Sequence, residues 1–144
     1  MELCVCLSKL TKNGYKSTFQ REALITFFLE NNRTMRSAKE IWEYMTHLTG
    51  KQASFGNVYH NLYLLCTFGI IDKTDYCGEA FFYLKEMSQK ESVLFICTHC
   101  RRISYFPNGL LEQALKKEEK EHAYKMINQR FEIYGLCPEC QLSG

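Results

Sequence analysis

The sequence predicts an α+β protein of two small domains, a helical domain that ends in a β-hairpin and a smaller mixed α/β domain. Three observations predict this class. Apolar residues recur at helical spacing through the first half, strand-like runs begin at residue 70, and the polar stretch 86–92 separates the halves. With 144 residues, 46% of them hydrophobic, the chain can bury two modest cores.

Three helices are expected in succession before any strand. Thr18 can cap the first, because a threonine side chain accepts a hydrogen bond from the first helical turn. Ser37 and Glu40 have the spacing of a capping box for the second, which Gly50 ends. Ser54 begins the third, whose apolar residues recur at steps of three and four.

Two strands, 70–74 and 80–84, follow these helices and flank a turn at Cys77-Gly78. Helices followed by a hairpin indicate a winged helix-turn-helix domain, which we place at residues 1–85. The polar segment 86–92 is the expected linker, and residues 93–144 form the second domain.

The second domain is expected to alternate strands and one helix. Strand patterns cover 93–96, 103–106 and 130–134, and a helix is expected to start at Pro107, since proline suits a first helical turn. The outer strands lead into two cysteine pairs.

These pairs are Cys97-x-x-Cys100 and Cys137-x-x-Cys140. Each turn can direct two thiolates at one point, as a tetrahedral Zn²⁺ requires, so we expect one structural zinc per chain. Two disulfides or a redox pair are the alternative. The N-terminus has no pattern of a secretion signal, so a cytoplasmic protein is expected, and in the cytoplasm such spacing favours metal.

Composition and motifs argue against several classes of function. No apolar run reaches 18 residues, so no membrane partner is expected. An enzyme is not expected either, because four sulfur ligands leave zinc no open position and no phosphate-binding glycine loop is present. We expect no small-molecule substrate.

Charge and polarity point to the first domain as the interacting one. The net charge is only +2, but the segment from Lys9 to Arg21 carries cations and no acid. In the third helix, Asn57, Tyr59, His60 and Asn61 could meet base edges in a major groove. An ordinary solvated helix face is the alternative.

The same residues carry a family resemblance. The run Ser54-x-x-Asn57-Val58-Tyr59-His60-Asn61-Leu62 resembles the recognition helix of the ferric uptake regulator family. The motif Lys16-x-Thr18-x-x-Arg21 and both cysteine pairs follow the family's order, and the similarity leans toward its peroxide-responsive (PerR-like) branch.

The resemblance implies a homodimeric transcription regulator, usually a repressor, that binds double-stranded DNA at an AT-rich inverted repeat. Residues 93–144 would be the dimerisation domain and the four cysteines would hold its zinc. The implied DNA-binding residues are Lys16, Arg21, Ser54, Asn57, Tyr59, His60 and Asn61.

One part of the family pattern is missing. The family senses metal with histidines and carboxylates, often in a His-rich run before the first cysteine pair, where this chain has Lys90-Glu91-Ser92-Val93-Leu94. A second, regulatory Fe²⁺, Mn²⁺ or Zn²⁺ is therefore an open question. The remaining candidate regulatory metal or redox residues are Cys4, Cys6, His99 and His122.

Three hypotheses remain. The first is a metal- or redox-responsive repressor whose regulatory ligands have moved, and the second is a regulator that binds DNA without an effector. The third is a zinc-ribbon protein-interaction module, which would not need Lys16, Arg21 and Tyr59.

Overall fold

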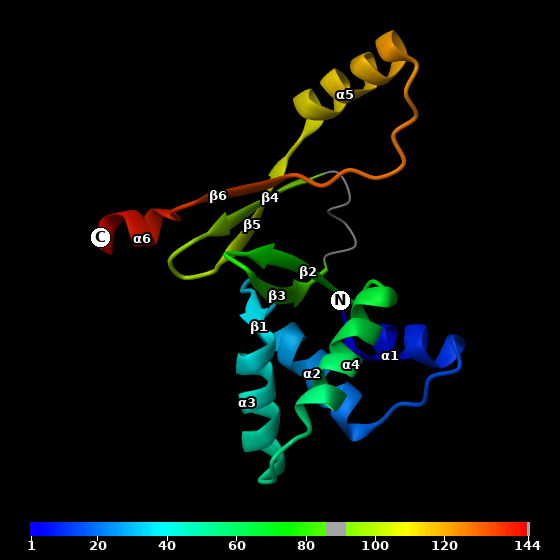
Figure 1. Ribbon diagram of the computed structural model, residues 1–144, viewed down its shortest axis with the longest axis vertical. Coiled ribbons are helices and arrows are strands. Elements are labelled where there is room, and N and C mark those ends of the chain that lie inside the picture. The colour runs from blue at the N-terminus through cyan, green and yellow to red at the C-terminus, as the bar shows by residue number, and fades with distance from the viewer. Residues whose placement is uncertain (86–91, 144) are drawn as a thin grey trace. The chain divides into compact units, whose positions relative to one another are not determined.

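The computed structural model of the chain describes residues 1–85 and 92–143. It contains two compact units, Met1–Glu86 and Met87–Gly144 (Figure 1). The α+β class is confirmed. The predicted linker lies outside the described residues except for Ser92, which is the first residue of a strand.

The predicted caps define the three helices of the first unit. Thr18 accepts a hydrogen bond from the backbone N–H of Arg21, and Ser54 accepts one from that of Asn57. Ser37 makes the full capping box. The three helices are α2 (Phe19–Glu30), α3 (Ala38–Thr49) and α4 (Phe55–Thr67).

The expectation that three helices precede any strand is wrong at two places. A further helix, α1 (Leu3–Lys12), comes first, and it buries Cys6 and Leu10 in the core. A short strand, β1 (Arg36–Ser37), precedes α3. It escapes sequence patterns because pairing with a distant strand, rather than periodicity, defines it.

The wing is a three-stranded antiparallel sheet in the order β1-β3-β2. The hairpin joins β2 (Ile71–Tyr76) to β3 (Glu79–Leu84), as predicted. Its turn residues, Cys77 and Gly78, both have positive φ, the backbone conformation of the tight hairpin turns that match strand twist.

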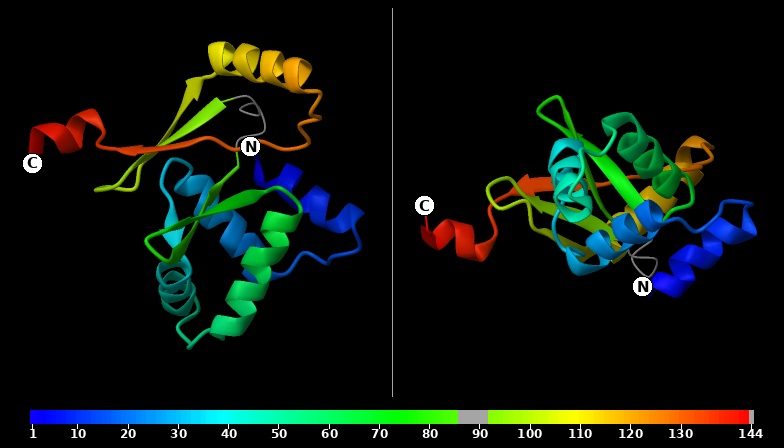
Figure 2. Two further views of the ribbon diagram at one scale, coloured as in Figure 1. Left: turned by 45° about the horizontal axis from the view of Figure 1, so that its top comes forward. Right: turned by 90° about the horizontal axis from the view of Figure 1, so that it is seen from below.

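One hydrophobic core unites the first unit. All four helices and the wing contribute side chains that are fully removed from solvent, so the unit has the apolar burial of an independent domain. Figure 2 shows α4 lying along the hairpin. The largest of these side chains are Phe28, Phe82, Leu10, Leu24, Ile25, Ile41, Met45, Leu62, Leu65, Ile70 and Ile71.

The second unit is a three-stranded sheet in the order β5-β4-β6. The central β4 (Ser92–Cys97) pairs antiparallel with β5 (Ile103–Pro107) and parallel with β6 (Glu132–Gly135). The predicted alternation of strand, helix and strand between the cysteine pairs is therefore confirmed. A parallel pair needs a crossover, which α5 (Gly109–His122) supplies.

Two details of this unit differ from the sequence expectation. Pro107 ends β5, and the helix begins two residues later with Asn108 as its N-cap. A short final helix, α6 (Pro138–Ser143), was not expected.

No residue of α5 is buried, and Leu110 on its first turn is 86% exposed. Among the described residues, no helix has the length and apolarity needed to cross a bilayer.

Candidate functional site

The parallel pairing of β4 and β6 brings the two cysteine pairs together. Cys97 is the last residue of β4 and lies opposite Gly135, the last residue of β6. The N–H of Thr98 donates to the carbonyl of Gly135 at 2.9 Å, which continues the ladder to the first residue of the cysteine turn. Both pairs therefore emerge at the same end of the sheet.

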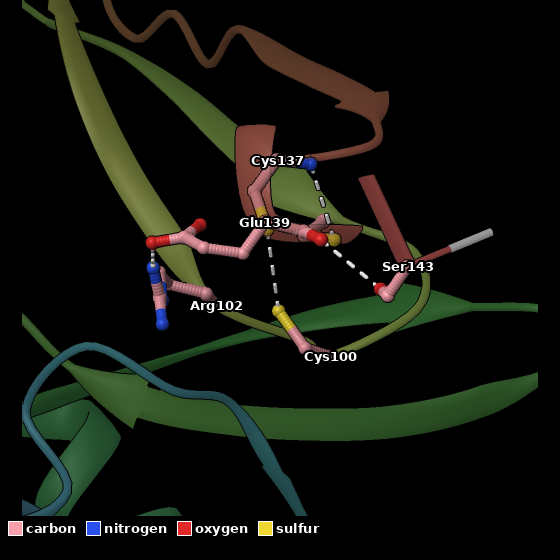
Figure 3. Close-up of polar contacts among 6 residues, drawn as sticks. Cys100, Arg102, Cys137, Glu139 and Ser143 are labelled. Carbon is pink, nitrogen blue, oxygen red and sulfur yellow. Dashed lines mark hydrogen bonds and ion pairs between the residues drawn. The ribbon is translucent and has the colours of Figure 1, made fainter. Parts of the chain in front are cut away.

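The four thiols form one cluster. The sulfurs of Cys97, Cys100, Cys137 and Cys140 all lie within 4.8 Å of one another, and those of Cys100 and Cys137 are 3.7 Å apart. Sulfurs placed tetrahedrally at the usual Zn–S distance are separated by about 3.8 Å. The donor set therefore fits Zn²⁺ in a closed, structural site, and Figure 3 shows part of this cluster.

Ionisation of the cluster is uneven. Burial disfavours the Cys97 thiolate, but the backbone N–H groups of Cys100, Cys137 and His99 outweigh burial and lower the pKa of Cys97 from 9.0 to about 6. The Cys137 sulfur, followed by burial, raises the pKa of Cys140 to about 12. In this arrangement Cys97 therefore ionises readily while Cys140 keeps its proton.

An ion pair ties the two cysteine turns together beside the thiols (Figure 3). Arg102 donates from Nη1 to Glu139 Oε1 at 2.6 Å. This hydrogen bond lowers the pKa of the Glu139 carboxyl and raises the pKa of Arg102. Both side chains are about half exposed, so the pair contributes more to alignment of the turns than to stability.

Zinc retention should depend steeply on pH. Zinc release lets the thiolates take up protons, so the apparent zinc affinity should fall as pH falls. Because the second unit unfolds when zinc leaves, all four thiols then take up protons below the ordinary cysteine pKa of about 8.5. We expect log affinity to fall by about four for each pH unit in this range. A zinc competition assay from pH 8 to 5 would show this slope, and an affinity that does not change with pH would contradict it.

The first unit presents a distinct polar surface on α4. Val58, Leu62 and Leu65 are buried beneath the helix, whereas Asn57 and His60 are exposed on its outer side. Ser54 is exposed as well, and its hydroxyl caps the helix, so it fixes where the outer face begins.

Aromatic rings extend this surface along α4. Tyr59 lies 6.1 Å from Phe55 and 6.3 Å from Tyr63, and it meets Phe82 of the wing edge-on at 6.1 Å. The rings border an open, mostly apolar hollow of about 630 Å³ on this face. Sequence reasoning missed Tyr63, which is 54% exposed, and Lys73 of β2, whose Nζ lies 5.7 Å from the Tyr63 ring. The four-residue step from Tyr59 to Tyr63 was the available signal.

The remaining predicted DNA-binding residues divide into exposed and buried. Lys16 is exposed in the segment before α2, and Arg21 is half-buried on the first turn of α2. Asn61 is only 6% exposed, and its side chain is bonded to other residues of the unit. The prediction that Asn61 reads base edges is therefore wrong for this structure, because its polar atoms face inward.

The candidate regulatory residues of each unit do not form a metal cluster with one another among the described residues. Cys4 is exposed on α1, whereas Cys6 lies in the core, where burial raises its pKa. In the second unit His99 is exposed in the first cysteine turn. His122 at the end of α5 pairs with Glu118 at 3.0 Å, and with Glu121 they form an exposed cluster.

Comparison with known proteins gives a consistent result. The profile of the ferric uptake regulator family matches residues 12–134. A ferric uptake regulation protein of Staphylococcus epidermidis is 30% identical over 135 residues, which cover 92% of this chain and 91% of that protein. The peroxide-responsive repressor PerR of Staphylococcus saprophyticus is 26% identical, with 94% and 88% covered.

A solved structure extends the likeness to the fold. A zinc uptake regulator complexed with zinc and DNA superposes with a TM-score of 0.76 at 18% identity, covering 98% of this chain and 93% of that one. At this identity the match establishes the shared fold.

Proposed function

Because the chain belongs to the ferric uptake regulator family, we propose that it is a DNA-binding transcription regulator, acting in the cytoplasm as a homodimeric repressor on an AT-rich inverted repeat. The observation that carries the proposal is the outer face of α4. It combines a capped N-terminus, exposed hydrogen-bonding groups at Asn57 and His60, and an aromatic side chain at Tyr59. These are the groups that read base edges in a major groove.

The contacts that we propose follow from exposure and charge. Asn57, Tyr59 and His60 would meet base edges, Ser54 would lie near the backbone at the helix start, and Lys16 would reach phosphates or the neighbouring minor groove. Support also comes from the zinc uptake regulator of the same fold, whose structure contains DNA.

We propose that the second unit forms the dimer. Its helix α5 has no buried residue in the single chain, and several large apolar side chains of this unit are exposed. A second copy would cover such a surface, and two-fold symmetry would match an inverted repeat. The apolar residues concerned are Phe106, Leu110, Ile127, Ile133, Leu136 and Leu142.

We propose that Cys97, Cys100, Cys137 and Cys140 hold one structural zinc, which fixes the ends of β4 and β6. Cys4 and Cys6, the two candidate regulatory thiols, are poorly placed to bind a metal or sense an oxidant together. Cys6 is buried in the core while Cys4 is exposed, two positions away on the same helix. A response to iron, manganese, zinc or peroxide would need ligands other than this pair, and binding without an effector is the alternative version of the proposal.

The test is operator selection from a random duplex pool with zinc-loaded protein. Parallel tubes would contain a mild chelator, Fe²⁺, Mn²⁺ or added Zn²⁺. We expect enrichment of an inverted repeat by wild-type protein and none by the double variant Asn57→Ala, His60→Ala. Asn32→Ala changes an exposed asparagine in the turn after α2 and should enrich the same sequence.

Each outcome has a distinct meaning. Enrichment in one metal alone would establish a regulatory site, and equal enrichment in every tube would favour the version without an effector. A wild-type protein that enriches no sequence under any condition would contradict the regulator proposal.

A further inference from the structure

Asn61 lies on α4 but points into the fold, where every strong polar atom of its side chain has a partner. Its Oδ1 accepts from Arg21 Nε at 3.0 Å. Its Nδ2 donates to Gln20 Oε1 at 2.8 Å and to the carbonyl of Asn57 at 3.0 Å. An amide 6% exposed with this set of bonds fixes α4 against the first turn of α2.

Arg21 extends the same network from α4 to the segment before α2. While Nε bonds to Asn61, Nη1 donates to the backbone carbonyl of Lys16 at 2.7 Å. The guanidinium also lies over the Tyr15 ring, 5.7 Å from its centroid, and Tyr15 meets Phe68 at the end of α4 edge-on at 5.3 Å. The segment that carries Lys16 is thus attached to α4 at two points.

Only arginine can make these contacts together. Its planar fork presents Nε and Nη1 in fixed directions, whereas a lysine ammonium is a single point charge on a flexible stem. Thr18 caps α2 within the same segment, so the backbone between Lys16 and Arg21 has little freedom to adjust.

We infer that Arg21 and Asn61 are positioning residues, which hold the backbone of Lys16 at a fixed place relative to the recognition face of α4. The inference rests on the proposed DNA-binding function. It changes the role of two residues: Asn61 orients α4 from inside, and Arg21 acts on DNA through Lys16. The two DNA-contacting elements are then presented as one preorganised surface, which saves the cost of ordering Lys16 on binding.

The test is a double-mutant cycle with Arg21→Lys and Lys16→Ala, measured on a duplex that the wild-type protein enriches. Arg21→Lys keeps the charge but not the fork, and Lys16→Ala leaves the accepting carbonyl in place. We expect each single variant to bind about tenfold more weakly, and Arg21→Lys to cost less than about twofold when Lys16 is already alanine. Lys39→Gln, which removes an exposed cation from α3, is the matched control and should have little effect.

The salt dependence distinguishes positioning from direct phosphate contact. Loss of one phosphate contact lowers the slope of log affinity against log salt by about 0.9. If Arg21→Lys misplaces Lys16, the slope for this variant should fall by the same amount, although no charge has been removed. If Arg21→Lys keeps the wild-type affinity and slope while Arg21→Gln loses both, Arg21 is a plain phosphate contact and the inference is overturned. Additive losses in the cycle would overturn it as well.

A measurement without DNA separates this inference from the proposed function. The N–H groups of Gly14 and Tyr15 donate to α1 carbonyls at 3.0 Å, so hydrogen exchange reports the order of the segment. Exchange across residues 13–18 should be faster in Arg21→Lys and Asn61→Ala but unchanged in Lys16→Ala, with melting temperatures checked to exclude global unfolding. Unchanged exchange in all three variants would refute the network even if the protein binds DNA. Faster exchange in a protein that binds no DNA would instead refute the proposed function alone.

Discussion

Replacement of Cys97 by serine should abolish zinc binding and unfold the second unit while the first unit remains folded. The second unit has a small core, and its helix α5 buries no residue in the single chain. Among its described residues, the buried apolar side chains are Val93, Leu94, Ile96, Cys97, Ile103 and Cys137. Structural zinc in comparable small sites supplies about 10–16 kcal/mol of apparent binding free energy. A fold with so little apolar burial cannot lose that contribution and persist.

Cys97 is the most informative of the four positions. Its sulfur is fully buried and accepts from the N–H of Cys137 at 3.4 Å, so it joins the two cysteine turns even apart from the metal. Serine is a poor zinc ligand of ordinary hydroxyl pKa, and it would be buried there without the thiolate chemistry that the site requires.

The measurement combines zinc content with hydrogen exchange of the two units. We expect zinc to fall from one per chain to near zero, and amides of β4, β5 and β6 to lose their protection. The matched control is Cys77→Ser, which changes an exposed cysteine in the wing turn and should retain zinc and protection. A Cys97→Ser protein with stoichiometric zinc and protected strands would show that the metal is not the support of this unit.

Much of this architecture follows from local signals in the sequence. Helices α2, α3 and α4 could be predicted because Thr18, Ser37 and Ser54 each cap a helix within four residues of sequence. The zinc cluster could be predicted because two Cys-x-x-Cys turns have one common use in a chain of this kind. Both inferences depend on short-range chemistry.

The missed elements depend on tertiary contacts. Glu2 at the start of α1 makes no side-chain cap, and the helix is held by Cys6 and Leu10 inserted in the core. Strand β1 exists because Arg36 and Ser37 pair with β3. Such pairings have no local signature.

Asn61 is buried although its polar side chain predicts exposure. Its spacing from Val58 and Leu65, three and four residues, places it on the buried face of α4. The helical position of Asn61 indicates burial, whereas its polar residue type indicates exposure to solvent. The partner that makes burial favourable, Arg21, is forty residues away in sequence, so neither signal alone could settle its role.

Replacement of Tyr59 by alanine should cause the largest loss of DNA affinity of any single change on α4. The ring is half-buried and packs against Phe55, Tyr63 and Phe82, and it lines the hollow on the outer face of α4. A good base contact is worth about 1–3 kcal/mol, and loss of the ring would also loosen the neighbouring aromatic rings. We expect operator affinity to fall by about 100-fold, with Tyr59→Phe, which keeps the packing, losing less.

The salt dependence and two controls make this result specific to base contact. Tyr59 carries no charge, so the slope of log affinity against log salt should stay at its wild-type value, whereas Lys16→Ala should lower it by about 0.9. Tyr124→Ala removes a tyrosine that is 71% exposed in the second unit and should leave affinity unchanged. Full operator binding by a folded Tyr59→Ala protein would exclude Tyr59 as a base-reading residue of α4. Loss of operator binding in a folded Tyr59→Ala protein would count against the zinc-ribbon interaction module, because such a module does not need Tyr59.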